Sequence, residues 1–526
     1  MGNKPKAWHL AAREAVIDRR QAMRTFAIAA GAVTAAACGS DGTTAPSRSG
    51  GTIPPATTAP TTAAPPTTAL PTTTVAPEPT IAFDPNTPWW LQGGFAPVAE
   101  EVELTDLEVV GALPPSLTGL YARNGSNPLE GSGHWFFGDG MAHGLRLERG
   151  QAKWYRNRFV QTPQFTGAIP DGPPGREAGY SNVSFFTHAG RLLSSGEVGW
   201  PMELSPDDLS TVGVESWGGA LGPNFTAHPK VDPATGLMHA FGYGFVDPFL
   251  TYYVISADGS EVVHSTVVPV SGPTMMHDFA ITDSDVVFWE LPVVFSLDAA
   301  VAGDALPYAW DPSYGSRLGV LPLGGDGADT RWVEIENGYV FHGTNAWRDG
   351  EVIHLDVNRI DSAFDGRSTN IGSGDSTLHR WSLDTSGAEL AWTDQILLPD
   401  IAMDFPMIDR RFTGRAHTQA WYALAEDLPT GDGLMFPGVI AYDVASGDVT
   451  RWDSGPGLQP GEPLFVPDSD GAGEGEGWLL SFGYSPSSDS SRLLVLDATD
   501  VAAGPVAEVT LPVRVPFGFH GTWVSG

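Results

Sequence analysis

Four histidines stand at or near the ends of short apolar runs, where an imidazole ring needs either a hydrogen-bond partner or a metal. They lie in the stretches NFTAHPK, TMMHDFA, GYVFHGTNAW and FGFHGTW, as His228, His277, His342 and His520. Neutral imidazole is a common ligand of iron, zinc, copper and nickel. The four are tens of residues or more apart, unlike the ligands of a zinc finger or an HExxH helix. Spacing and composition alone do not separate them from the other histidines, most of which we expect to be hydrogen-bonded core or surface residues.

The elements that would position these histidines are short strands. From about residue 85 to residue 526, alternating apolar and polar runs are separated by turn residues, as in GVIAYDVASGDVTRWDSG (438–455) and LHRWSLDTSGAELAWTDQ (378–395). No long amphipathic helix is evident, and 63 Gly and 44 Pro residues suit a fold of strands and turns. Repeated hairpins over this length predict an all-β propeller, with a set of β-sandwiches as the alternative. The inner strands of a propeller converge on one axis, so histidines from several blades could meet there.

The chain is strongly acidic and long enough to bury a large core. Its 526 residues include 28 Lys and Arg against 62 Asp and Glu, a formal net charge of -34. Such a surface lacks the positive charge that binds nucleic-acid phosphates or anionic lipid headgroups. We therefore expect no nucleic-acid partner, and the sequence implies no obligate protein partner.

The N-terminal region is expected to lie outside the folded domain. Residues 1–38 resemble a bacterial signal peptide, with the pair Arg19 and Arg20, an apolar stretch over 26–37 and the only cysteine, Cys38, at its end. The arginine pair indicates twin-arginine export, and AAAC resembles a lipoprotein box in which Cys38 is lipidated; an ordinary signal peptide with an incidental cysteine is the alternative. Residues 39–84 are rich in Thr, Pro and Ala and predict a disordered linker. We expect an exported protein in the cell envelope, held to the outer face of the cytoplasmic membrane by a lipid, with its folded domain over 85–526.

The residues that flank the four histidines carry a more specific signal. The chain contains, in this order, LTGLYARNGSNPL (117–129), HWFFGDGMAHGLRL (134–147), NVSFFTHAGRLLSSGE (182–197), FTAHPKVDPATGLMHAFGY (225–243), MMHDFAIT (275–282), FHGTNAW (341–347), GEPLFVP (461–467) and FGFHGTW (517–523). Together these stretches resemble the motifs of the carotenoid cleavage oxygenases, a family that includes stilbene-cleaving enzymes and the retinoid isomerohydrolase of vision. The resemblance implies a seven-bladed β-propeller capped by a dome of loops and short helices. It also implies one ferrous iron on the axis, bound by His228, His277, His342 and His520.

The same resemblance places three acidic residues against the outer nitrogens of the ligands. They are Glu197 in SSGEV, Asp404 in AMDFP and Glu462 in GEPLF. Partners of this kind fix the tautomer and the direction of a ligating imidazole. Glutamate is usual in the family where Asp404 stands, so we expect the shorter side chain either to pull its partner ring or to need a bridging water.

The activity implied by the resemblance is that of a non-haem iron(II) dioxygenase, which cleaves a C=C double bond of an apolar polyene with O2 to give two carbonyl products. Stilbene-cleaving relatives hold a phenol with a lysine and a tyrosine, and the matching positions here are Gly196 and Phe159. Loss of both polar groups favours a carotenoid or apocarotenoid over a phenolic stilbene. Aromatic residues near the motifs are candidates for lining the substrate tunnel, with ordinary packing as the alternative for each: Phe159, Phe225, Phe279, Phe341, Phe519 and Trp523.

Two other classes of function remain open at this point. A propeller hydrolase or lactonase with axial calcium would need mainly carboxylate and amide oxygens near the axis. A non-catalytic, surface-anchored binding propeller could keep the ligand set without turnover. Four matched histidines do not suit the first alternative, whereas the second is compatible with the sequence.

Overall fold

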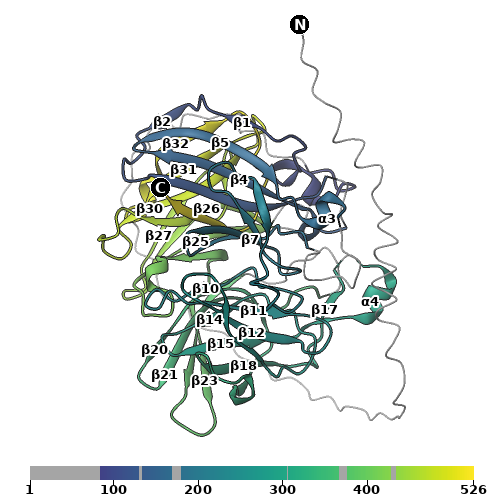
Figure 1. The fold of residues 1–526 in the computed structure, drawn as a ribbon. Coiled ribbons are helices and arrows are strands. Elements are labelled where there is room, and N and C mark those ends of the chain that lie inside the picture. The colour runs from purple at the N-terminus through teal and green to yellow at the C-terminus, as the bar shows by residue number, and fades with distance from the viewer. Residues whose placement is uncertain (1–82, 130–132, 169–178, 305, 366–375, 428–433) are drawn as a thin grey trace, which may run out of the picture.

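A computed structural model describes residues 83–129, 133–168, 179–304, 306–365, 376–427 and 434–526 (Figure 1). The signal peptide predicted over 1–38, with Arg19, Arg20 and Cys38, lies outside the described residues. So does nearly all of the linker predicted over 39–84. Among the described residues, no helix is long and apolar enough to cross a bilayer.

Seven antiparallel sheets, each with four or more strands, form the blades of a propeller. Blade 1 consists of β33 (Gly521–Ser525), β3 (Gly119–Asn127), β4 (Asp139–Glu148), β5 (Gln151–Phe159) and β1 (Glu103–Leu104). Blade 2 consists of β6 (Ser184–His188), β7 (Arg191–Ser195), β8 (Met202–Leu204) and β9 (Thr211–Val214). Blade 3 consists of β10 (Lys230–Val231), β11 (Met238–Tyr243), β12 (Leu250–Ile255) and β13 (Val262–Val267).

The remaining four blades repeat this plan, each given from its inner strand outward. Blade 4 consists of β14 (Phe279–Ile281), β15 (Asp285–Glu290), β18 (Ser316–Pro322) and β19 (Arg331–Ile335). Blade 5 consists of β20 (Tyr339–Asp349), β21 (Val352–Ile360), β22 (Thr377–Asp384) and β23 (Ala391–Leu398). Blade 6 consists of β24 (Met403–Ile408), β25 (Gln419–Asp427), β26 (Leu434–Asp443) and β27 (Val449–Asp453). Blade 7 consists of β28 (Gln459–Pro460) and β29 (Leu464–Pro467), both paired with β30 (Gly477–Ser485), then β31 (Ser490–Asp497), β32 (Pro505–Leu511) and β2 (Val109–Gly111).

The two ends of the described chain close the ring. The C-terminal strand β33 pairs with β3 in blade 1, and the early strand β2 pairs with β32 in blade 7. In Figure 1 the purple and yellow ends of the chain accordingly lie side by side in one half of the molecule. Neighbouring inner strands also contact one another, as β33 does β6 and β20 does β24. This closure excludes separate β-sandwiches and confirms the predicted all-β, seven-bladed propeller.

Local sequence explains the hairpins within a blade. In the β26–β27 hairpin, the Asp443 carboxylate accepts hydrogen bonds from the backbone N–H groups of Ala445 and Ser446, and Gly447 adopts a left-handed φ of 80°. The turn sets the register in which Tyr442 faces Val449. Inner strands such as β20 are buried along most of their length, whereas the outer strand β13 alternates between half-buried and exposed residues. Burial therefore increases toward the axis.

Short helices and a two-stranded insertion lie in the connections between strands. The insertion in blade 4 consists of β16 (Val293–Phe295), α4 (Leu297–Ala302) and β17 (Tyr308–Trp310). The other helices are η1 (Trp89–Leu91), η2 (Gly93–Phe95), η3 (Trp135–Phe137), α3 (Pro163–Thr166), η4 (Gly327–Asp329), η5 (Arg410–Phe412) and η6 (Val501–Ala503). Helices η1, η2 and η3 bring tryptophan and phenylalanine rings into one buried cluster with Phe405 and Phe519 of the blades. This aromatic cluster, called the dome cluster below, reaches the inner strand β24 through Phe405.

Candidate metal centre

The four histidines come from four different blades and meet at the axis. His228 precedes β10, His277 precedes β14, and His520 precedes β33, while His342 lies within β20. Each therefore stands on or beside the innermost strand of its blade. The convergence of inner strands in a propeller brings together side chains that are remote in sequence.

The imidazole rings are in mutual contact. The ring centroid of His228 lies 4.7 Å from that of His277, 5.1 Å from His342 and 4.6 Å from His520. Further centroid distances are 5.2 Å for His277–His342 and 4.8 Å for His342–His520. The Nε2 atoms of His228 and His277 are 3.1 Å apart. The four rings thus surround one small volume.

Three carboxylates lie behind the rings, on the Nδ1 atoms. His342 Nδ1 is 2.7 Å from Asp404 Oδ1, and His520 Nδ1 is 2.8 Å from Glu462 Oε1. The Nδ1 atom of His277 contacts Glu197 Oε1. Because a carboxylate accepts, His342 and His520 donate from Nδ1 and keep the Nε2 lone pair for the centre, and the Glu197 contact favours the same tautomer of His277.

Every blade contributes one of these seven residues. Asp404 lies in β24 of blade 6, Glu462 precedes β29 of blade 7, and Glu197 lies between β7 and β8 of blade 2. The shorter Asp404 reaches His342 directly, without the bridging water that the sequence left open. The residue after it, Phe405, has a left-handed φ of 53°, and Glu197 has a φ of 62°, conformations that are uncommon for residues other than glycine and concentrate at functional sites.

Burial and neighbouring charges favour the neutral form of two of these rings and oppose each other at a third. Burial, together with the other imidazoles, lowers the pKa of His228 well below its ordinary value. Burial also lowers the pKa of His520, although the Glu462 carboxylate opposes the shift. Burial acts in the same direction on His277, but the carboxylates of Glu197, Asp278 and Asp404 together outweigh it and raise the pKa of that ring. Neutral imidazole is the form that binds metals.

The residues fit a metal ion bound by nitrogen. Nε2 of His342 is buried without a hydrogen-bond partner, and the Nε2 atoms of His228 and His277 face each other, with the donor decided by the tautomer. Adjacent nitrogens bound at right angles to one ion by bonds of about 2.1 Å would lie roughly 3 Å apart, close to the 3.1 Å observed. Ligand atoms of His228, His342 and His520 lie within 4.8 Å of one another. An all-imidazole set suits iron and other transition metals, and it lacks the oxygen ligands that calcium requires.

Aromatic rings border the centre. Phe341 lies edge-on to His277 with centroids 5.4 Å apart, and Phe364 contacts Phe341 at 6.1 Å. Phe405 stacks on His342 at 5.5 Å and lies 5.3 Å from His520. These rings make the immediate surroundings of the histidines apolar.

The six aromatic candidates from the sequence divide between the centre and other parts of the propeller. Phe341 is at the centre, and Phe519 belongs to the dome cluster, 4.3 Å from Trp135. Phe225 and Phe279 are fully buried in clusters that join neighbouring blades, and Trp523 packs against the cluster that joins blades 1, 6 and 7. Phe159 stacks on Phe165 at 5.0 Å. The contacts of these last four are those of ordinary packing.

The sequence analysis missed several residues of the centre. Phe405 could have been found from its position directly after Asp404, but Phe364 has no such signal. The Tyr243 hydroxyl donates to Glu197 Oε2 at 2.5 Å, and it lies within a stretch matched to the family motifs without having been assigned a role. Lys230 and Asp278, which flank two of the histidines, form an ion pair at 2.8 Å.

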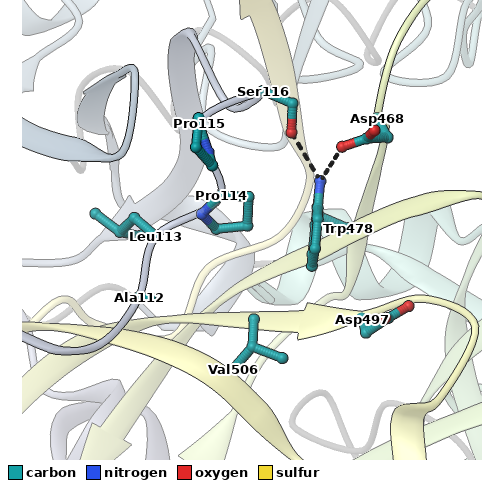
Figure 2. A pocket seen from close by; sticks show the side chains of 9 residues that line it. All are labelled: Ala112, Leu113, Pro114, Pro115, Ser116, Asp468, Trp478, Asp497 and Val506. Atoms are coloured by element: carbon teal, nitrogen blue, oxygen red, sulfur yellow. Dashed lines mark hydrogen bonds between the residues drawn. The ribbon is translucent and has the colours of Figure 1, made fainter.

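A separate hollow of about 430 Å³ lies at the far end of blade 7 (Figure 2). Strand β29 leads from the side of Glu462 to Asp468 at this hollow, so the hollow is at the opposite end of the strand from the histidines. The indole N–H of Trp478 donates hydrogen bonds to Ser116 Oγ and to Asp468 Oδ1, as the dashed lines in Figure 2 show. This hollow is therefore distinct from the candidate metal centre.

Known proteins resemble this chain in sequence and in architecture. The family model described as "Retinal pigment epithelial membrane protein" matches residues 95–525. The chain is 37% identical over 494 residues to a carotenoid cleavage oxygenase of Mycobacterium tuberculosis, and the match covers 82% of this chain and 97% of that protein. It is 33% identical over 494 residues to carotenoid 9,10(9',10')-cleavage dioxygenase 1 of Arabidopsis thaliana, and this match covers 83% of this chain and 90% of that protein. The crystal structure of a Pseudomonas brassicacearum lignostilbene dioxygenase matches with a TM-score of 0.76 at 27% identity, over 84% of this chain and 99% of that chain.

Proposed function

The chain belongs to the carotenoid cleavage oxygenase family, and from this premise we propose that it is an iron(II)-dependent dioxygenase that cleaves a C=C double bond of a carotenoid or apocarotenoid. The balanced reaction consumes one O2 per double bond and gives two carbonyl products. The observation that supports it most strongly is the meeting of four imidazoles from four blades, with carboxylates behind three of them.

Each group of residues has a distinct part in this proposal. His228, His277, His342 and His520 would hold the metal, and ferrous iron at this site would supply the activation of O2. Glu197, Asp404 and Glu462 keep the Nδ1 protons in place and aim the rings. The apolar walls formed by Phe341, Phe364 and Phe405 hold the polyene beside the centre and exclude water.

The structure bears on the choice between a polyene and a phenolic stilbene. A Cβ atom at Gly196 would lie 2.9 Å from Ser181 N and 3.0 Å from Asn182 Oδ1, so the backbone leaves no room there for a lysine without movement. Phe159 is buried against Phe165 and carries no hydroxyl. Neither polar group that would hold a phenol is present, which supports a carotenoid or apocarotenoid substrate although a lignostilbene dioxygenase has the same fold.

Incubation of the purified, iron-loaded protein with a panel of carotenoids and apocarotenoids in air tests this function. We expect loss of polyene absorbance and two carbonyl products whose new oxygen atoms come from labelled O2. His277→Ala should abolish turnover. A protein that binds iron but leaves every polyene unchanged would point to a binding propeller, and one that binds calcium and no iron would point to a hydrolase.

We also propose, from the sequence alone, that the protein is exported and anchored by a lipid on Cys38. The apolar substrate class fits an enzyme held close to a membrane. Cys38→Ser should release the protein from the membrane fraction, and replacing Arg19 and Arg20 by lysine should retain the precursor inside the cell. Normal export of the lysine variant would exclude the twin-arginine route.

A further inference from the structure

One buried carboxylate outside the ligand set, Asp278, joins three segments of the candidate metal centre. Its Oδ1 atom lies 2.8 Å from the Lys230 ammonium nitrogen and also accepts from the Phe279 N–H at 2.8 Å. Its Oδ2 atom accepts from the Gly343 N–H at 2.9 Å. The Asp278 side chain is 2% exposed, so these contacts are the ones that compensate its buried charge.

The partners of Asp278 are placed so that the carboxylate links ligand to ligand. Asp278 and two of its partners each lie within two residues of a histidine of the centre: Lys230 is close to His228, Asp278 follows His277, and Gly343 follows His342. The three segments belong to blades 3, 4 and 5. A single side chain therefore sets the spacing of three histidines that share no strand.

A second ion pair provides a comparison within the same molecule. Asp285 Oδ2 lies 2.7 Å from Arg348 Nη2 and joins blades 4 and 5 as the contact with Gly343 does. Its side-chain exposures, 9% and 22%, are close to the 2% and 22% of the Asp278–Lys230 pair. Asp285 lies beyond the outer end of β14, roughly 13 Å along the strand from Asp278 at about 3.3 Å per residue. Its partner Arg348 lies in β20, six residues beyond His342, and Asp285 itself lies eight residues beyond His277, so this pair joins the two blades away from the histidines.

We propose that Asp278 and Lys230 are positioning residues for the metal, forming a brace that holds His228, His277 and His342 at binding distance before the ion arrives. The proposal rests on the proposed function, in which these histidines bind iron. The brace lowers the cost of ordering the ligands, so its loss weakens metal binding more than it weakens the fold. The fourth histidine, His520, is held separately by Glu462, which accepts hydrogen bonds from the His520 ring and from the Gly521 N–H.

Cobalt(II) titration of the metal-free full-length protein tests the brace, with the ligand-field absorption bands as the readout. In Asp278→Asn an amide replaces the charge and cannot satisfy both Lys230 and Gly343. We expect cobalt affinity to fall about 10- to 100-fold, the range found for lost outer partners of metal ligands, and the bands to change position or intensity. Asp285→Asn should destabilise the metal-free protein comparably and leave cobalt affinity and spectrum unchanged.

Lys230→Met provides a second variant that keeps the tie to Gly343. It should weaken cobalt binding less than Asp278→Asn does, and the double variant should bind no more weakly than Asp278→Asn alone. Wild-type affinity and spectrum in Asp278→Asn would overturn the brace, as would an equal loss of affinity in Asp285→Asn. Failure of the wild-type protein to bind iron or cobalt would instead overturn the proposed function, and the brace with it.

Discussion

Replacing Asp404 by asparagine and by alanine separates the charge of this carboxylate from its shape. Both hydrogen bonds that end on it, from His342 Nδ1 and from the Phe405 N–H, use the same oxygen, Oδ1, at 2.7 Å each. Asparagine keeps an oxygen at that position and can accept both bonds without the charge. Alanine removes the acceptor and leaves a buried imidazole N–H unpaired.

The two variants should differ clearly in metal affinity. Hydrogen bonds to charged groups contribute about 1.5–3 kcal/mol and neutral ones about 0.5–1.5 kcal/mol, so Asp404→Asn should lose roughly 1 kcal/mol, or about fivefold in affinity. An unpaired buried donor costs about 1–3 kcal/mol, so Asp404→Ala should lose roughly 5- to 150-fold. His342 is 8% exposed, so water cannot readily replace the lost partner.

Competitive titration of iron(II) or cobalt(II) against a chelator measures these affinities, and thermal unfolding of the metal-free variants controls for damage to the fold. Turnover should fall in the same order, wild type, asparagine, alanine. Equal losses in the two variants would show that the charge, not the acceptor geometry, is what His342 needs. Wild-type affinity in Asp404→Ala would refute the view that this carboxylate aims the ring.

Three further outcomes are expected. Burial lowers the pKa of His239 and of His417 from 6.5 to about 4. Between these two pH values the unfolded chain binds more protons than the folded protein does. The free energy of unfolding should therefore fall as the pH falls from about 6.5 to 4, by about 1.4 kcal/mol per pH unit for each ring. Denaturant unfolding across this window measures the slope, and a flat profile would contradict it. Phe225→Ala should lower the free energy of unfolding by about 3–5 kcal/mol and leave the cleavage products unchanged. Phe405→Ala should alter the cleavage products or the rate at which they form. Altered products in Phe225→Ala and unchanged products in Phe405→Ala would contradict the placement of Phe405, and not Phe225, beside the substrate. Removing the metal with a chelator should abolish turnover and lower the melting temperature, since an ion at 100 times its dissociation constant stabilises by about 2.7 kcal/mol, and iron(II), not calcium, should restore both.

Local patterns predicted the strands well because alternation and turn chemistry act over a few residues. The stretch 438–455 contains the second half of β26 and all of β27, with the turn at Asp443–Gly447 as the sequence indicates. The seven-bladed architecture followed from the family motifs and is confirmed. The same motifs selected four histidines that composition alone could not separate from the others.

Side-chain direction was much less predictable. Phe225 is three residues from His228, yet it packs against Trp217 and Phe186 between blades 2 and 3. The position of the Phe405 ring beside the centre depends on a left-handed backbone conformation at this residue, which the local sequence does not predict. Consecutive residues of a strand point to opposite faces, so proximity in sequence to a ligand does not place a ring in the site.

The sequence by itself determined the acidic character of the chain, the positions of its strands and turns, and the set of residues with the chemistry to bind a metal. Only the tertiary structure decided that these residues meet, which carboxylate serves which ring, and that Asp278 joins three segments that bear histidines. The physical reason is that strand and turn preferences are local free energies. The distances at the axis instead result from the packing of seven blades, to which residues throughout the folded chain contribute.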